Sequence, residues 1–196
     1  PDMEFVEDKK GKSKQGVGLL PFRVIEGDVE FLIGEVTNIF HAMPDEEPDE
    51  GFKGKWTCFK GKIDKGEDAK TAARREFKEE STFSWEGELD DSMIVENNNV
   101  KVWLIDSGEF DPSRFDRNNV NKITGEYLKG EPEIWSIGWF SSTEAQNKLA
   151  KNQKDLIPQA MEKINKNPLE EAKKEITKLR IFDFDETIAF TSATTY

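Results

Sequence analysis

Three glutamates in one short stretch are the residues of this chain best suited to carry out chemistry. Glu76, Glu79 and Glu80 are spaced i, i+3 and i+4, so a helix would place their carboxylates on one face. Like charges this close repel one another, which a purely solvated helix would avoid. Mg²⁺ changes that balance, because it takes oxygen ligands and favours carboxylates together with substrate phosphates. The spacing therefore predicts a metal site on one helix face.

The residues just before these acids predict the helix itself. An apolar stripe at helical spacing, suited to face a core, is formed by Ala69, Ala72, Ala73 and Phe77. Asp68 precedes this stripe and is expected to cap the first turn. We therefore expect a helix that packs its apolar stripe on the core.

The whole segment 61–83 follows a longer pattern, and its fixed residues are, in order, Gly61, Glu67, Arg75, Glu76, Phe77, Glu79, Glu80 and Phe83. This resembles the Nudix box (Gly, five residues, Glu, seven residues, Arg-Glu-apolar-any-Glu-Glu-any-Gly-apolar). One defined position differs, because Thr82 stands where the family has Gly. A pattern with this many fixed positions is much more specific than a lone glycine motif. The alternative interpretation is a solvated acidic helix with accidental spacing.

The resemblance extends over residues 15–166. Trp56 and Lys60 before the box, and Gly138-Trp139-Phe140 late in the chain, look like a bacterial branch described as predicted nucleoside polyphosphate pyrophosphohydrolases. The resemblance implies an α/β fold, the Nudix α/β/α sandwich with a mixed β-sheet between helices. It also implies hydrolysis of a nucleoside diphosphate linked to another group, with nucleoside triphosphates and dinucleoside polyphosphates as the favoured substrates.

The resemblance further implies a role for each site residue. Glu76, Glu79, Glu80 and the carbonyl of Gly61 would hold Mg²⁺ or Mn²⁺. Glu67 and Arg75 would pair to keep the loop and the helix in register. Lys60 and Lys62 could meet substrate phosphates, although they and Lys65 could equally offset the nearby acids.

A further glutamate is needed to orient or deprotonate the attacking water. Glu133 stands six residues before Trp139, the spacing of a metal-site glutamate in related diadenosine polyphosphate hydrolases, and Glu131 and Glu126 are its rivals. Glu79 and Glu80 are the other catalytic candidates.

The threonine at position 82 is also compatible with a function other than hydrolysis. Gly at this position allows a left-handed turn after the helix, which is costly for a β-branched residue. A Nudix-fold module that binds a nucleotide without cutting it is therefore an alternative, although the complete set of box acids argues against it.

Composition restricts the partners. The formal net charge of −12 and the pI near 4.7 disfavour nucleic acid backbones and anionic lipid, so we expect a small nucleotide and no sequence-specific nucleic acid or membrane partner. Cys58 is the only cysteine, which suits a reducing compartment and a cytoplasmic location. The sequence does not indicate an oligomeric state.

Hydrophobic patterns predict the remaining elements. Strands are expected at Gly16–Val24, Val29–Val36, Trp56–Phe59, Ser84–Glu96, Val100–Ile105 and Ile134–Phe140. Ser141 and Glu144 form a capping box for one helix, and another, amphipathic helix surrounds Ile157.

The connections between these elements are less regular. An acidic stretch at 45–50, near the lone His41, is expected to be a solvated loop or a flap beside the site. Residues 107–133 are expected to form a long irregular excursion. Base-stacking candidates, which burial statistics place more often in a core, are Phe22, Phe40, Trp103 and Trp135.

The two ends of the chain differ from the centre. Residues 1–14 are expected to be a flexible lead-in. Residues 167–196 are expected to be a linker helix and the truncated start of a second domain. Here an apolar strand ends in Asp183-x-Asp185-x-Thr187, which resembles motif I of haloacid dehalogenase-type phosphatases. That resemblance implies a bifunctional Nudix–phosphatase protein; the alternative is a chance pair of aspartates in a short motif.

Overall fold

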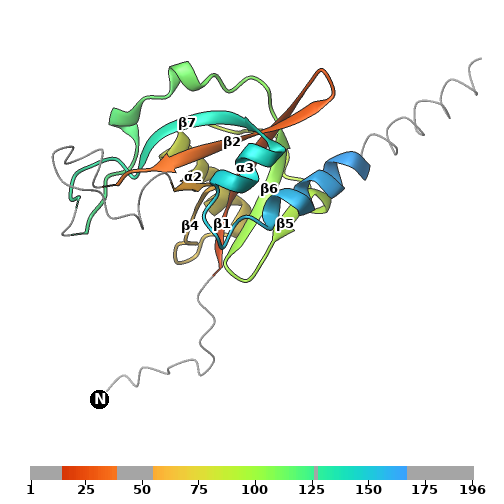
Figure 1. Cartoon of the computed structure of the whole chain (residues 1–196). Helices are drawn as coiled ribbons and strands as arrows, with labels where there is room; N and C mark the ends of the chain where they lie inside the picture. Colours follow the sequence, from red (N-terminus) through yellow and green to blue (C-terminus); the bar gives the residue numbers. More distant parts are fainter. Residues whose placement is uncertain (1–14, 39–54, 126–127, 167–196) are drawn as a thin grey trace, which may run out of the picture.

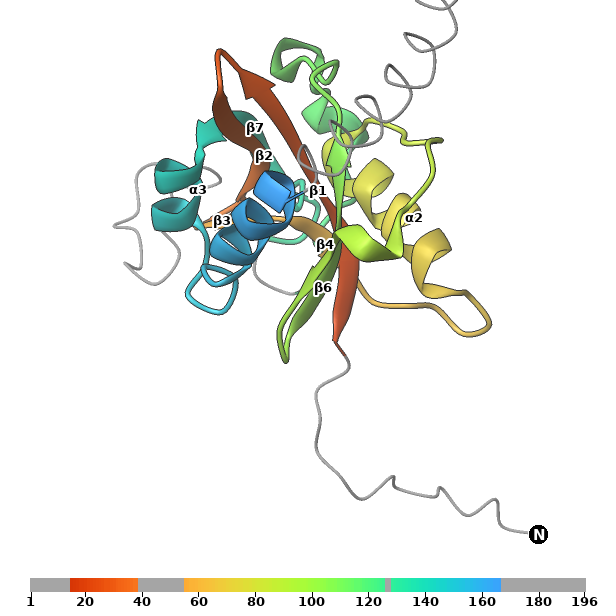
Figure 2. The ribbon, with the colours of Figure 1, turned by 90° about the vertical axis from the view of Figure 1, so that its right-hand side faces the viewer.

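A mixed sheet of seven strands lies between helices on its two faces (Figures 1 and 2). The structure is a computed structural model, and it describes residues 15–38, 55–125 and 128–166. The arrangement confirms the predicted α/β/α sandwich with a mixed sheet. The predictions for the lead-in, the acidic stretch with Phe40 and His41, Glu126 and the tail with Asp183 and Asp185 lie outside the described residues.

A hairpin and a parallel pair form the centre of the sheet. β1 (Gly16–Ile25) and β2 (Asp28–Val36) are joined by a tight turn, in which Glu26 and Gly27 have φ values of 53° and 93°. β6 (Val100–Asp106) runs parallel to β1, and β5 (Ile94–Glu96) pairs antiparallel with β6. β7 (Ile134–Ser141) pairs antiparallel with β2 along most of its length.

Two short strands lie where β1 and β2 diverge. β4 (Phe59–Gly61) pairs with the first half of β1, and β3 (Trp56–Thr57) pairs with the second half of β2. The single strand predicted for Trp56–Phe59 is therefore interrupted at Cys58. The reason is that the Cys58 N–H donates to Oε1 of Gln153 at 2.9 Å.

The helix α2 (Ala69–Ser81) covers one face of the sheet. Ala72, Ala73 and Phe77 are completely buried, which confirms the predicted apolar stripe. They share one core cluster with Trp103, so this stacking candidate belongs to the core.

The opposite face carries α3 (Ser142–Lys148) and a helix over residues 156–166 (Figure 2). Ser141 and Glu144 form the predicted capping box. Phe22, a second stacking candidate, is buried in the cluster on this face together with Val102 and Ile157. Alternating side chains of β6 therefore pack in the two cores.

The strand predicted for Ser84–Glu96 is wrong over most of its length. Only Ile94–Glu96 is a strand, and it follows the 3₁₀ turn η1 (Asp91–Met93). Side chains of α2 take the carbonyls that a neighbouring strand would need, because Arg74 donates to the Gly87 carbonyl at 2.5 Å and Lys70 to the Leu89 carbonyl at 2.8 Å.

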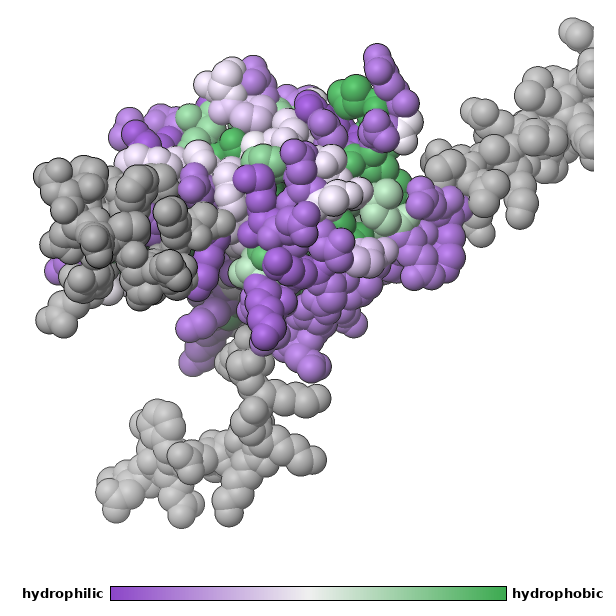
Figure 3. Space-filling model, in the orientation of Figure 1, coloured by the Kyte–Doolittle hydropathy of each residue, from purple (hydrophilic) through white to green (hydrophobic). Residues whose placement is uncertain are grey.

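The excursion after β6 is irregular, as predicted, with two short 3₁₀ turns, η2 (Pro112–Arg114) and η3 (Arg117–Asn119). The face seen in Figure 3 is mainly hydrophilic, with hydrophobic residues at the tip of the β1–β2 hairpin, where Val24 and Ile25 are about half exposed (53% and 48%). In the described part of the chain, no helix is both long and apolar enough to cross a membrane.

Candidate active site

The two ends of α2 are fixed by local contacts. Asp68 caps the start, where its Oδ1 accepts hydrogen bonds from the N–H groups of Lys70 (3.0 Å) and Thr71 (3.1 Å). Thr82 ends the helix in the left-handed conformation, with φ of 66° and ψ of 2°. The left-handed turn expected for a Gly at this position is thus made here by a β-branched residue, at a cost of about 1–2 kcal/mol.

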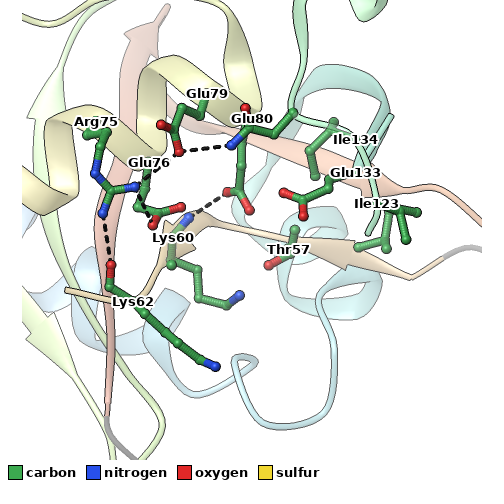
Figure 4. Close-up of a pocket in the computed structure, with 13 residues that line it drawn as sticks. Thr57, Lys60, Lys62, Arg75, Glu76, Glu79, Glu80, Ile123, Glu133 and Ile134 are labelled. Carbon is green, nitrogen blue, oxygen red and sulfur yellow. Dashed lines mark hydrogen bonds and ion pairs between the residues drawn. The ribbon is translucent and has the colours of Figure 1, made fainter. Parts of the chain in front are cut away.

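The acids of α2 open onto a cavity of about 600 Å³ (Figure 4). Carboxylates from two elements line it: Glu76, Glu79 and Glu80 from α2, and Glu133 just before β7. The other residues that line the cavity are Val36, Thr57, Lys60, Gly61, Lys62, Arg75, Asn121, Ile123 and Ile134. Acidic and basic side chains therefore share one small space with an apolar wall.

Arg75 joins the loop after β4 to the helix. Its guanidinium donates to both oxygens of Glu67, at 3.0 and 2.9 Å, a bidentate pair. The same group donates to Glu76 at 2.8 Å and to Glu79 at 3.1 Å. It also donates to the Lys62 carbonyl at 2.9 Å, so one side chain ties this loop to two of the box acids (Figure 4).

Glu80 is the most buried of these acids, with only 8% of the residue exposed. Burial raises its pKa to about 8, the Glu76 and Glu133 carboxylates add to the rise, and Lys60 opposes it. Burial also raises the pKa values of Glu76 and Glu133, and the neighbouring acids Glu76 and Glu79 add to the rise for Glu133. The cavity therefore brings together carboxyl groups whose ionised forms water does not fully solvate.

Gly61 is required by its distance from Glu76. A Cβ atom at this position would lie 2.1 Å from the Glu76 carboxylate, far closer than any real contact. Register places Gly61 opposite Val17 at the end of β4. The absence of a side chain thus allows the acid of α2 to approach the strand.

The structure distinguishes between several predicted residues. Glu133 lines the cavity, whereas its rival Glu131 does not. Lys60 and Lys62 line the cavity, whereas Lys65 does not. Trp135 lies under the Arg117 guanidinium, which is 3.9 Å from the ring centre, and it does not line the cavity.

Two polar residues of the cavity, Thr57 and Asn121, were not predicted. Thr57 is buried and is hydrogen-bonded to Gln153. Asn121 lies in the irregular excursion, where the sequence is rich in Asn and Asp and no local pattern marks one position.

Comparison with protein families identifies the chain. The NUDIX domain profile matches residues 42–160, which is more than half of the sequence. The chain belongs to the Nudix family. The match does not include β1 and β2, although these strands are central to the same sheet as the matched residues. No curated protein sequence matches this chain.

Solved structures resemble this Nudix domain at low sequence identity. A C. elegans Ap4A hydrolase in a binary complex has 20% identity over 74% of this chain and 93% of its own, with a TM-score of 0.48. A mutT/nudix family protein from Listeria innocua has 18% identity over 79% and 94%, with a TM-score of 0.47. The NUDIX domain of Shewanella oneidensis NrtR, complexed with ADP ribose, has 16% identity over 81% and 94%, with a TM-score of 0.45.

The donor set of this Nudix domain suits a hard divalent cation. Four carboxylates line the cavity, and three of them have pKa values raised by burial, so a cation would relieve their repulsion. Among the described residues, no three acidic, histidine or cysteine side chains already converge as metal ligands. Arg75 holds one oxygen of Glu76 and one of Glu79, and the Lys60 N–H holds one oxygen of Glu80. The other oxygen of each carboxylate could bind a cation once the three side chains move closer together.

Proposed function

We propose that this Nudix domain hydrolyses a pyrophosphate bond in a nucleoside diphosphate linked to another group, with Mg²⁺ or Mn²⁺ as its cofactor. Nucleoside triphosphates and dinucleoside polyphosphates are the substrates we favour. The observation that supports the proposal is that the carboxylates of Glu76, Glu79, Glu80 and Glu133 line one cavity together with Lys60 and Lys62. This combination suits a polyanionic substrate that arrives with metal ions.

Different residues would bind the cation, bind the phosphates and support the site. Glu76, Glu79, Glu80 and the Gly61 carbonyl would hold the cation, which when bound neutralises phosphate charge and orients water. Lys60 and Lys62 would contact phosphate oxygens as point charges. Arg75, through its pair with Glu67, would keep the box loop against α2.

The reaction needs a group that accepts a proton from water. The water oxygen forms a bond to phosphorus while the bridging P–O bond breaks, and the proton passes to a carboxylate. We assign this role to Glu133, with Glu79 and Glu80 as the other catalytic carboxylates. The raised pKa of Glu133 makes it a stronger base at neutral pH than an exposed glutamate.

A substrate screen with purified protein tests the proposal. Nucleoside triphosphates, dinucleoside polyphosphates, nucleotide sugars and capped RNA would each be incubated with Mg²⁺ or Mn²⁺, and released phosphate or pyrophosphate measured. E79Q, E80Q and E133Q should lose at least 90% of the activity, on the order of the loss when a catalytic group is removed. E88Q, at an exposed position outside the cavity, should retain it.

Two outcomes would contradict the proposal. Full activity of E79Q and E80Q at saturating metal would show that the site is wrongly assigned. Nucleotide binding without release of any phosphate product would instead favour the non-catalytic binding module. The bifunctional Nudix–phosphatase hypothesis concerns the tail and is tested separately, by asking whether the native protein contains a phosphatase domain after residue 196.

A further inference from the structure

Asn121 contacts both elements that supply the acids of the cavity. Its main-chain N–H donates to the carbonyl of Glu79 at 3.2 Å, and its side-chain Nδ2 donates to Oε2 of the same residue at 3.0 Å. Its own carbonyl accepts from the N–H of Glu133 at 2.8 Å. One residue of the excursion is thus bonded to the end of α2 and to the residue that precedes β7.

The main chain around Asn121 is held in place without its side chain. Next to it, Lys122 and Pro132 form a β-bridge, and the Ile123 N–H donates to the Glu131 carbonyl at 2.8 Å. Glu133 is fixed from its other side, where its carbonyl accepts from the Thr37 N–H at 3.1 Å. Removal of the side-chain carboxamide of Asn121 should therefore leave the path of the main chain unchanged.

The Asn121 side chain acts on the orientation of one carboxylate. Oε2 of Glu79 accepts from both Asn121 Nδ2 and Arg75 Nη1, the second at 3.1 Å. Two donors on one oxygen limit rotation of the carboxylate and direct Oε1 away from them. An amide does this without adding another carboxyl group to a cavity that already contains four.

We propose that Asn121 is a positioning residue, whose amide orients the Glu79 carboxylate for the divalent cation. The inference rests on the proposed function, because it assumes that Glu79 holds that cation. Partners that orient a metal ligand affect affinity even though they do not touch the metal. Asn121 is exposed, so we expect its contribution to be at the lower end of the range for such partners.

Mn²⁺ titration of the protein without substrate tests the inference, with calorimetry as the readout. N121A should weaken Mn²⁺ binding by about threefold to tenfold relative to the parent. N118A is the matched control, because Asn118 is an exposed asparagine of the same excursion that does not line the cavity, and it should bind Mn²⁺ like the parent. The melting temperature of N121A should match that of N118A.

A double mutant identifies the partner. If the amide acts through Glu79, N121A should have no further effect on Mn²⁺ affinity in the E79Q background. The inference would be overturned if N121A weakened Mn²⁺ binding equally in the parent and in E79Q. It would also be overturned if N121A bound Mn²⁺ like the parent while E79Q bound it more weakly. Both outcomes would leave the proposed function intact. A parent protein that neither binds Mn²⁺ nor hydrolyses any substrate would overturn both.

Discussion

The main-chain N–H of Lys60 donates a hydrogen bond of 2.6 Å to Oε2 of the buried Glu80. This contact joins the end of β4 to the last turn of α2. Only part of the cost of burying the acid is offset, because the pKa of Glu80 is still raised to about 8. Between about pH 4.5 and pH 8, Glu80 is therefore protonated in the folded, metal-free protein and ionised in the unfolded chain.

The stability of the metal-free protein should consequently depend on pH. The pKa of Glu80 is higher in the folded protein than in the unfolded chain. The stabilising contribution of Glu80 is therefore fully present below about pH 4.5 and is lost as pH rises through about 8. The free energy of unfolding in EDTA should decrease over this range, by up to about 1.4 kcal/mol per pH unit for one proton. Urea denaturation between pH 5 and pH 8.5 measures the slope.

E80Q provides the control for this prediction. Glutamine keeps an acceptor for the Lys60 N–H and does not titrate, so the slope should become smaller and the variant should be more stable than the parent at pH 8. An unchanged slope in E80Q would show that Glu80 is not the titrating group. Mg²⁺ should stabilise the parent more at pH 8 than at pH 6, because it competes with protons for the carboxylates.

G61A should damage the site and leave the fold intact. The new Cβ would lie 2.1 Å from the Glu76 carboxylate, which is the end of a flexible side chain and can move away. We expect loss of hydrolysis by about tenfold or more with little change in melting temperature. G108A is the matched control, because the nearest atom to its Cβ would be 3.7 Å away. A parental rate for G61A would mean that the position of Glu76 is not critical.

T82G should stabilise the protein by about 1 kcal/mol, since glycine adopts the left-handed conformation of Thr82 without strain. T82A separates the effect of the backbone from that of the side chain. Alanine keeps a Cβ at φ of 66° and loses the hydrogen bond that the Asp116 N–H donates to the threonine hydroxyl, so it should give no gain. Chemical denaturation of the three proteins compares them, and equal stabilisation by Gly and Ala would argue against strain.

Q153A should destabilise the fold by about 2–3 kcal/mol. Gln153 is buried, and its Oε1 accepts from the N–H of Cys58 at 2.9 Å, so truncation leaves a buried donor without its partner. Gln146 is a partly exposed glutamine of α3, so Q146A should lower the free energy of unfolding much less. The difference in the urea midpoint measures the effect, and similar losses in the two variants would contradict it.

Local signals explain what the sequence predicted well. The cap at Asp68, the apolar stripe and the spacing of the acids all act within α2, where neighbours in sequence are neighbours in space. The capping box of Ser141 and Glu144 is local in the same sense. The Nudix box adds Gly61 and Glu67, because a family pattern carries information about the loop that a periodicity does not.

Long-range contacts explain what the sequence did not predict. Asn121 is placed in the cavity next to Glu79, its hydrogen-bond partner 42 positions away in the sequence. Thr57 is hydrogen-bonded to Gln153, which is 96 positions away. The wrongly predicted part of the strand, residues 84–93, has the same origin, because its apolar residues suit a sheet while Arg74 and Lys70 bind two of its carbonyls. Gln153 lies in the turn that precedes the helix over residues 156–166, where no local pattern marks it.

The chain leaves the sheet at Val36 and returns at Lys55, where the N–H of the first donates to the carbonyl of the second at 2.9 Å. Val36 also forms part of the cavity wall, while the carboxylates come from α2 and from the residue before β7. This hydrogen bond joins the two ends of the intervening segment, and the free energy of closing a connection between two fixed ends rises only slowly with its length. Insertions or deletions in that segment would therefore leave the four cavity carboxylates in place, because all four come later in the sequence.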